Sequence, residues 1–273
     1  MIKNAIMKYS FFVILLLFTL SSLSLAQQEM RIQEINKRLW SEGSAYVLPQ
    51  KRVEIGMFQP LRYGQSENIE WSTHPIYFFI IPNLNIKWFH DSYENVAIAS
   101  RYSVYYPTIL LRTIAREGTG GIISPEFNIP QMIGFNGEAL FSKYIHENTL
   151  LTAKLGLAFG IKFGGLDDRT TIDLPLVYNR LAVFYHGYQL RGGLDLDGHL
   201  YKRWYYSLDM DYFYIPNVEH NEAFEHKGLL IWQKSEKTRI TVGYKLIYAE
   251  YPFGSQWHLF IPLLDIQKAW NRN

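Results

Sequence analysis

The sequence has no cysteine, and this absence excludes both a disulfide framework and a lipid anchor attached to a cysteine. The stability of the protein must therefore come from packing or from closure of a sheet. After residue 26 the sequence also has no apolar run of the ~20 residues that a transmembrane helix needs. If the chain enters a membrane, it must do so as a closed barrel, because an open sheet leaves unpaired backbone groups in lipid.

Net charge is also lacking. The chain carries 27 Lys and Arg against 25 Asp and Glu, and Lys3 and Lys8 lie in a leader that we expect to be removed. The remaining 25 basic and 25 acidic side chains balance, which gives no electrostatic reason to expect nucleic-acid binding. P-loop, Rossmann, HExxH and GxSxG patterns are absent in the context they require, and no loop has calcium-ligand spacing. We therefore expect no cofactor and no metal.

The first 26 residues have the three parts of a cleavable export signal. Lys3 and Lys8 supply positive charge, residues 11–20 are apolar, and Ser24-Leu25-Ala26 is a small-x-small cleavage site. We expect residues 27–50 to form a periplasmic N-terminal segment, either a short helix, periplasmic or plugging, or a poorly ordered terminus. Residues 51–273 are then expected to form one large domain.

Residues 185–216 carry the clearest pattern in the chain. In the first arm Tyr188, Leu190 and Leu194 alternate with Gln189, Arg191 and Asp195, and the second arm, from Trp204 to Tyr214, alternates in the same way. Alternation is the period of a β-strand, and two arms joined by about three residues predict a hairpin. Each arm exceeds the ~9–11 residues that a tilted strand needs to cross a bilayer. A leucine face edged with Tyr and Trp and backed by charges is typical of a transmembrane barrel.

The same alternation predicts strands along the rest of the domain. They cover about 52–63, 74–90, 96–111, 133–145, 151–163, the two arms of 185–216, 224–234, 239–250 and 257–266. Long and short connections alternate, with both ends of the domain on the short-turn side, as in outer-membrane barrels. We therefore predict an all-β, transmembrane antiparallel up-and-down barrel of about ten strands, or twelve if residues 170–184 contain a further pair. Pro82, Pro107 and Pro262 predict bulges.

The chain resembles outer-membrane β-barrel proteins in general, through its export signal, dyad repeat, aromatic rims and alternating connections. The resemblance covers nearly all of the mature chain and matches no single family. It implies the outer membrane of a Gram-negative type of cell, contact with outer-membrane lipid and insertion by the barrel assembly machinery. The terminal aromatic that this machinery reads is replaced by Trp270 followed by Asn-Arg-Asn. The alternative is a soluble periplasmic β-barrel that binds an apolar ligand.

A ten-stranded barrel is narrow, so we expect its lumen to be filled mostly by side chains. The charged residues expected to line it carry both signs, and a salt-bridge network is their simplest role; they are Glu138, Lys154, Lys162, Arg191, Asp195, Asp209, Asp211 and Lys245. Arg191 is expected to lie almost opposite Asp211. The alternative role is the selectivity lining of a small solute pore.

The functions that this architecture favours are a narrow porin-like channel or a structural or surface-interaction barrel. Its candidate partners are small solutes or surface molecules, reached through residues 112–132 and 164–184.

An outer-membrane hydrolase is the enzymatic alternative. The run His90-Asp91-Ser92 is similar to the His-x-Ser of outer-membrane phospholipase A, which implies a base and a nucleophile at His90 and Ser92. The aspartate pairs Asp195/Asp197 and Asp209/Asp211 are similar to the carboxylates of omptin proteases. We expect His90-Asp91-Ser92 in a periplasmic turn and the aspartate pairs near the periplasmic half of their strands. The site of the omptins lies instead at the outer rim of the barrel.

Overall fold

The computed structural model describes residues 42–167, 170, 181–216, 219, 222–251 and 254–272. The expected export signal and residues 27–41 lie outside the described residues. The strands are β1 (Arg52–Gly56), β2 (Leu61–Gly64), β3 (Ile69–Thr73), β4 (Asn83–Tyr93), β5 (Val96–Tyr105), β6 (Gln131–His146), β7 (Thr149–Phe163), β8 (Tyr188–Tyr201), β9 (Trp204–Tyr214), β10 (Glu222–Ser235), β11 (Thr238–Tyr251) and β12 (Gly254–Asn271). Three short helices are α2 (Pro75–Phe78), α3 (Thr108–Ile114) and α4 (Val183–His186).

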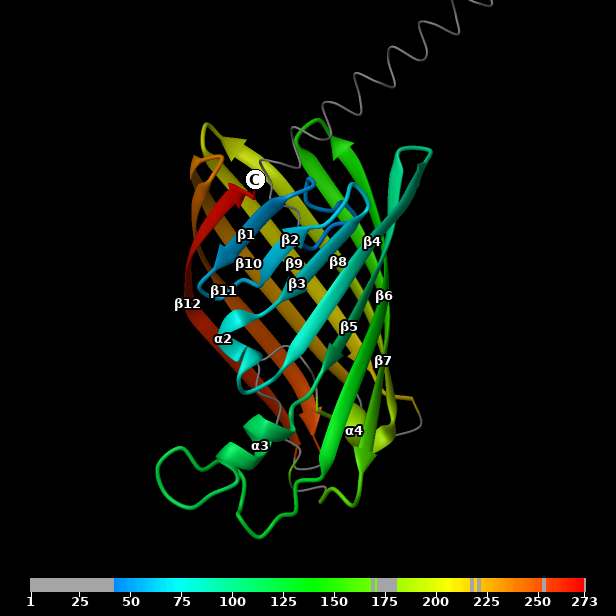
Figure 1. The fold of residues 1–273 in the computed structure, drawn as a ribbon, viewed down its shortest axis with the longest axis vertical. Coiled ribbons are helices and arrows are strands. Elements are labelled where there is room, and N and C mark those ends of the chain that lie inside the picture. The colour runs from blue at the N-terminus through cyan, green and yellow to red at the C-terminus, as the bar shows by residue number, and fades with distance from the viewer. Residues whose placement is uncertain are drawn as a thin grey trace, which may run out of the picture. The chain divides into compact units, whose positions relative to one another are not determined.

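The strands form one closed antiparallel barrel in which each strand pairs with its neighbours in sequence and β1 pairs with β12 (Figure 1). The predicted all-β up-and-down barrel is therefore confirmed. Its strand count is twelve, the stated alternative, so the main expectation of about ten was slightly too low.

The two additional strands come from a different part of the chain than expected. The predicted single strand 52–63 is the hairpin β1–β2, and the following polar loop contains β3. In the range 170–184, where a further pair was expected, the described residues include the start of α4, and residues 171–180 lie outside the described part. The predicted strand 74–90 begins with α2, and the predicted strand 96–111 ends in α3.

Prolines explain two of these boundaries. Pro82 precedes β4 and Pro107 precedes α3, so both lie outside the strands in which we expected bulges. Pro262 lies inside β12, where the register with β11 shifts between Gly243 and Lys245, as expected for a bulge. The shift also reverses which positions of β12 face outward. Leu259 before it and Leu264 after it are an odd number of positions apart, yet both side chains are exposed.

The two ends of the barrel differ in their connections. At one end, the short-turn end, two-residue turns join β4 to β5, β6 to β7, β8 to β9 and β10 to β11, and the C-terminus lies there too (Figure 1). Glu94 and Asn95 have positive φ angles of 47° and 65°, as the tight hairpin between β4 and β5 requires. At the other end, the long-connection end, residues 106–130 and 164–187 carry α3 and α4. β11 and β12 are also joined at this end by only two residues, so the expected alternation of long and short connections has an exception.

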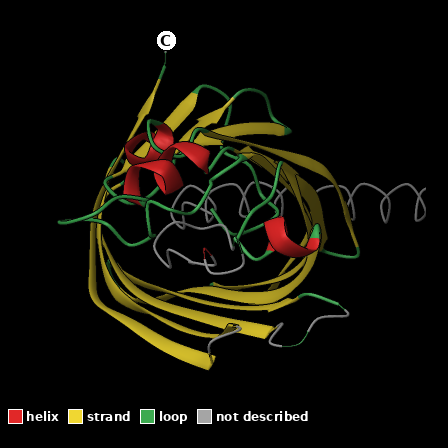
Figure 2. Ribbon diagram, turned by 90° about the horizontal axis from the view of Figure 1, so that it is seen from below, coloured by secondary structure: helices red, strands yellow, loops and turns green. Residues whose placement is uncertain are grey.

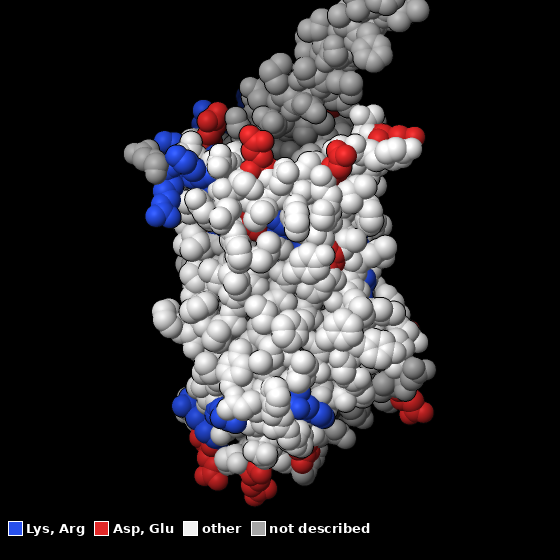
Figure 3. Space-filling model, turned by 45° about the vertical axis from the view of Figure 1, so that its right-hand side comes forward, with Lys and Arg blue, Asp and Glu red and all other residues white. Residues whose placement is uncertain are grey.

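The outer surface is apolar between these ends. Leu155, Leu194 and Leu208 point outward and are exposed, whereas Lys154, Asp195 and Asp211 point inward and are buried. Charged residues gather near the two ends of the barrel, and the band between them is mostly uncharged (Figure 3). No helix in the described part of the chain is long and apolar enough to cross a membrane.

One side of the barrel wall is formed by short strands and is therefore low along the barrel axis. β1, β2 and β3 contain 5, 4 and 5 residues, fewer than the ~9–11 that cross a bilayer. They occupy the short-turn half of the wall, and α2 follows directly below them in Figure 1. The neighbouring β12 is 18 residues long and continues toward the other end.

The apolar band predicts where a charge would be costly. Leu155 is 62% exposed in the middle of β7, and Leu200 is 55% exposed at the short-turn end of β8. We expect Leu155→Arg to lower the free energy of unfolding in vesicles by about 2–4 kcal/mol and Leu200→Arg by about 0–1 kcal/mol. Denaturant titration of both variants measures the difference. Equal effects would mean that Leu155 does not face hydrocarbon.

Candidate functional site

Lys154 is the centre of an ion cluster inside the barrel. Its Nζ lies 2.6 Å from Asp195 Oδ1, 3.3 Å from Asp209 Oδ1 and 2.8 Å from Asp211 Oδ1. Lys154 on β7 is opposite Gly193 on β8, and Gly193 is opposite Asp211 on β9. A Cβ at Gly193 would overlap the atoms of both Lys154 and Asp211, so the missing side chain allows this pair to meet across an intervening strand.

Arg191 joins this cluster to β6. Its Nη2 donates to Asp211 Oδ2 at 2.5 Å, and its Nη1 donates to Glu138, which also accepts from Arg101. The predicted proximity of Arg191 and Asp211 therefore exists, although the Cα partner of Arg191 is Phe213. These contacts form one of two ion clusters in the lumen, and we call it the second ion cluster because the other one begins earlier in the chain. Its four cations and four anions balance, as buried charges require. Its members are Arg101, Glu138, Lys154, Arg191, Asp195, Asp209, Asp211 and Lys227.

The other two predicted lining residues lie apart from this cluster. Lys245 on β11 pairs with Glu225 on β10 at 2.9 Å. Lys162 is exposed toward the long-connection end of β7, and its Nζ lies 5.7 Å from the centre of the Tyr185 ring. Of the eight predicted lining residues, six thus belong to the cluster, Lys245 lies in a separate ion pair and Lys162 lies at the rim.

A first ion cluster, formed by Arg52, Glu54, Arg62, Glu70 and Lys87, was mostly missed by the sequence analysis. Arg62 donates to both oxygens of Glu70 at 2.9 and 2.8 Å and to Glu54 Oε2 at 3.1 Å. Glu54 also accepts from Arg52 Nε at 2.7 Å. Glu70 lies between two expected strands, and the other four residues lie in expected strands but were not among the predicted lining residues.

Residues 42–48, here called the lumen segment, lie inside the barrel at the short-turn end. Lys87 Nζ donates to the carbonyl oxygens of Glu42, Ser44 and Tyr46 at 3.2, 3.1 and 2.8 Å. Ala45 N donates to Ser142 Oγ at 2.8 Å, and Leu48 N donates to Glu70 Oε2 at 2.9 Å. The segment therefore reaches the inner surfaces of β3, β4 and β6, and it closes the lumen where these strands surround it.

Small residues make room for the lumen segment. Ala45 packs with Ala97, Ala99 and Leu140 in a buried cluster, and Tyr46 stacks on the Phe89 ring. Burial raises the pKa of Tyr46 to about 12. A Cβ at Gly43 would overlap the carboxylate of Asp195, so the segment also approaches β8 closely. Part of the expected N-terminal segment is thus an ordered, non-helical plug.

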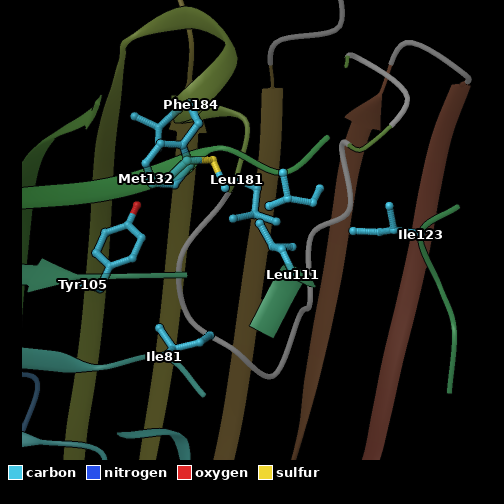
Figure 4. Packing of buried hydrophobic residues seen from close by; sticks show 9 residues of the cluster. Ile81, Tyr105, Leu111, Ile123, Met132, Leu181 and Phe184 are labelled. Carbon is cyan, nitrogen blue, oxygen red and sulfur yellow. The ribbon is translucent and has the colours of Figure 1, made fainter. Parts of the chain in front are cut away.

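At the other end, loops lie within the ring of strands (Figure 2), and an apolar cluster, here called the mouth cluster, packs there. Phe184 and Met132 lie together in Figure 4, with Tyr105 below them. Arg112 donates to the carbonyl oxygen of Ile129 at 3.0 and 2.9 Å and fixes α3 against the following segment. The buried members of the mouth cluster are Ile81, Tyr105, Leu111, Ile123, Ile129, Met132, Leu181, Val183 and Phe184. Described parts of both segments that were expected to bind surface partners therefore pack inward.

A cavity of about 600 Å³ lies between the lumen segment and the mouth cluster. Glu42 of the lumen segment borders it at one end, and Ile81 and Tyr105 of the mouth cluster border it at the other. Both ion clusters contribute charged groups to its wall, including Arg62, Glu138 and Asp211. Apolar groups form another part of the wall: Phe58, Phe213, Leu229 and the β12 residues Leu259–Leu264. The cavity can therefore hold a small molecule against a surface that is partly apolar and partly polar.

The residues singled out for hydrolysis have other partners. His90 Nε2 lies 2.8 Å from Ser100 Oγ on β5, and Asp91 accepts from the backbone nitrogen of Ser92 at 2.7 Å. Asp195 is opposite Asp209, and both carboxylates bind Lys154. No group of three His, Cys, Asp or Glu residues in the described part of the chain is arranged to hold a metal ion.

Comparisons with known proteins assign the chain to no family. No protein-family model and no curated protein matches the sequence. The chain is similar to solved structures of outer-membrane β-barrel proteins. A bacterial polysaccharide outer membrane secretin has 6% identity and a TM-score of 0.44, over 81% of this chain and 70% of that chain. OccK1 of Pseudomonas aeruginosa has 8% identity and a TM-score of 0.39, over 80% of this chain and 60% of that chain. The P. putida toluene transporter TodX has 9% identity and a TM-score of 0.36, over 83% of this chain and 80% of that chain. These values are too low to imply a shared function.

Lys154 tests the energetic role of the second ion cluster. In the described part of the chain, Asp195 has no cation other than Lys154 within bonding distance. We expect Lys154→Met to lower the free energy of unfolding by about 3–5 kcal/mol, because it leaves a buried carboxylate without a cation. Lys162→Met removes an exposed lysine from the same strand and should cost less than about 1 kcal/mol. Chemical unfolding in vesicles compares them; a small effect of Lys154→Met would show that the carboxylates are hydrated.

Proposed function

We propose that the protein is an integral outer-membrane β-barrel that binds a small solute in its lumen and passes it only when the lumen segment moves. The observation that carries this proposal is the cavity of about 600 Å³ that ends at the lumen segment. A permanently open pore requires a continuous aqueous path, and residues 42–48 lie across that path at the short-turn end. Among the two roles expected from the sequence, a narrow gated channel therefore fits better than a barrel filled throughout by side chains.

The outer-membrane location is supported by the surface. Outward positions along β6–β12 are apolar and exposed, and each of these strands has at least the 11 residues of β9. This meets the ~9–11 residues that a tilted strand needs to cross a bilayer. A soluble barrel would expose this apolar band to water, where it would favour aggregation.

The lumen segment is suited to be the moving part. It forms no strand in the described structure, and its polar contacts to the wall include those with the side chains of Lys87, Ser142 and Glu70. Its displacement would break no hydrogen bond between strands, so the barrel could remain closed while the path opens. The two ion clusters would then line the opened path.

Conductance through planar bilayers tests this gate. Lys87→Met removes the donor to three carbonyl oxygens of the lumen segment, so we expect channel openings to become several times more frequent than in the wild type. A disulfide between Ala45→Cys and Ser142→Cys, added to Lys87→Met, should abolish these openings until a reductant is supplied. The sequence has no other cysteine, and Lys87→Met with Ser142→Cys alone is the control.

Two results would contradict the gate. A steady conductance that persists in the oxidised double-cysteine protein would show that solute bypasses the lumen segment. A folded Lys87→Met protein that never opens would show that this segment is a permanent structural plug.

A further inference from the structure

The barrel wall is incomplete beside the cavity. β12 pairs with β1 from Gln267 to Asn271 only, and in the described structure its part from Gly254 to Ile266 has β11 as its single strand partner. In Figure 1 this part of β12 descends at the left past the ends of β1 and β2, and α2 lies across from it. The short β1–β3 strands thus leave one edge of β12 unpaired over more than half of its length.

The cavity reaches this unpaired edge. Seven consecutive residues, Leu259–Asp265, line it. In a strand paired on both sides, only alternate side chains face the lumen. On β12 the inward Phe260 borders the cavity together with the outward Leu259 and Ile261, which are 60% and 67% exposed. Runs of three lining residues also occur on β6 and β7, which are paired on both sides, but the run on β12 is longer and lies where the described structure gives β12 no partner other than β11. The cavity therefore reaches the opening that this missing partner leaves in the sheet.

Specific hydrogen bonds hold the opposite rim of this opening. Asp265 Oδ1 accepts from the backbone nitrogens of Met57 and Phe58 at 2.7 and 3.2 Å, which turns the chain into β2 instead of extending β1 along β12. His74 Nε2 lies 2.8 Å from the carbonyl oxygen of Phe58. Phe58, His74 and Tyr77 of α2 also line the cavity. The rim is therefore built by side chains and is not a frayed strand end.

Non-strand backbone at membrane depth is stable where it lines a cavity, whereas an open edge against lipid is not. We infer that β12, residues 57–60 and α2 frame a lateral opening through which an uncharged, mostly apolar molecule with one polar group passes between the hydrocarbon layer and the cavity. This inference rests on the proposed function, since it names the class of solute and its route.

Polar groups in the cavity indicate which polar group the ligand carries. Most of the charged residues in the lining form ion pairs, such as Arg62 with Glu70 and Lys245 with Glu225. In the described structure, the buried Gln189 Nε2, Thr241 Oγ1 and His74 Nδ1 have no hydrogen-bond partner, and all three residues line the cavity. They match a hydroxyl, carbonyl or amine group. A charged ligand would instead have to cross hydrocarbon, which is costly.

Photolabelling in phosphatidylcholine vesicles tests the route. The probe is 4-hydroxybenzophenone, which is neutral and dissolves in the bilayer, and its matched control is the anionic 4-benzoylbenzoate. Labelled peptides are identified by mass spectrometry. We expect the neutral probe to label lumen peptides containing Leu229 and Gln189, and the anion to leave them unlabelled.

The variant Leu259→Asp places a charge in the lateral opening. We expect it to lower labelling of the lumen peptides roughly tenfold, because an apolar solute gains little beside an ionised group at membrane depth. Leu155→Asp is the control, since Leu155 is as exposed as Leu259 but lies on β7 away from the cavity lining. Leu259→Trp, which fills the opening without a charge, should also lower labelling and serves if Leu259→Asp does not fold, as judged by heat-modifiable gel mobility.

The outcomes separate the two proposals. Equal lumen labelling in wild type, Leu259→Asp and Leu259→Trp would overturn the lateral route and leave the binding cavity intact. Lumen labelling by the anion at the same level would overturn both the route and the uncharged ligand class. If the neutral probe labels the outer surface but never the lumen, the proposed solute-binding function fails as well. If the Leu259 peptide is protected from a probe that labels Leu155, a second copy of the chain covers β12 and the lateral opening is refuted.

Discussion

The structure depends on closing the ring of backbone hydrogen bonds between the first and last strands. A barrel in lipid cannot leave this ladder open, yet β1 contributes only five residues to its seam with β12. Asp265 continues the seam for one more step by binding the backbone nitrogens of Met57 and Phe58. The chain then leaves β12 for β2. Closure is therefore secured at the short-turn end, and the low wall beyond it is a direct result of where this turn is placed.

The interior follows a polarity gradient along the barrel axis. Both ion clusters and the lumen segment lie toward the short turns, and the mouth cluster around Phe184 and Met132 lies toward the long connections. The first half combines mutually paired ions with the small apolar cluster around Ala45. The other half is stabilised by ordinary hydrophobic packing. The cavity occupies the transition between these two kinds of interior, which explains its mixed lining.

The sequence predicted the regular part of this structure well and the irregular part poorly. Strands β6–β11 were found within about two residues at most of their ends, because alternation between apolar and polar positions is a local signal. Arg191 was expected beside Asp211 since the turn between β8 and β9 fixes their register. The turn after β1 was missed because Asp265, which fixes it, is 208 positions from Met57. The role of residues 42–48 could not be predicted either. Lys87 binds their backbone carbonyl oxygens, and every residue has such an oxygen, so the sequence gives no signal for this contact.

The position of the lumen segment has a consequence for how the protein is assembled. The segment precedes β1 in the chain but is enclosed by strands that follow it, and the seam that shuts the ring requires β12, the last strand. The segment's contacts with the wall join residues far apart in the chain: Leu48 with Glu70 and Ala45 with Ser142, which are 22 and 97 positions away. Bringing such distant residues together costs chain entropy, and so does pairing the first strand with the last. Assembly therefore has to offset this loss of entropy twice, once inside the barrel and once at its seam.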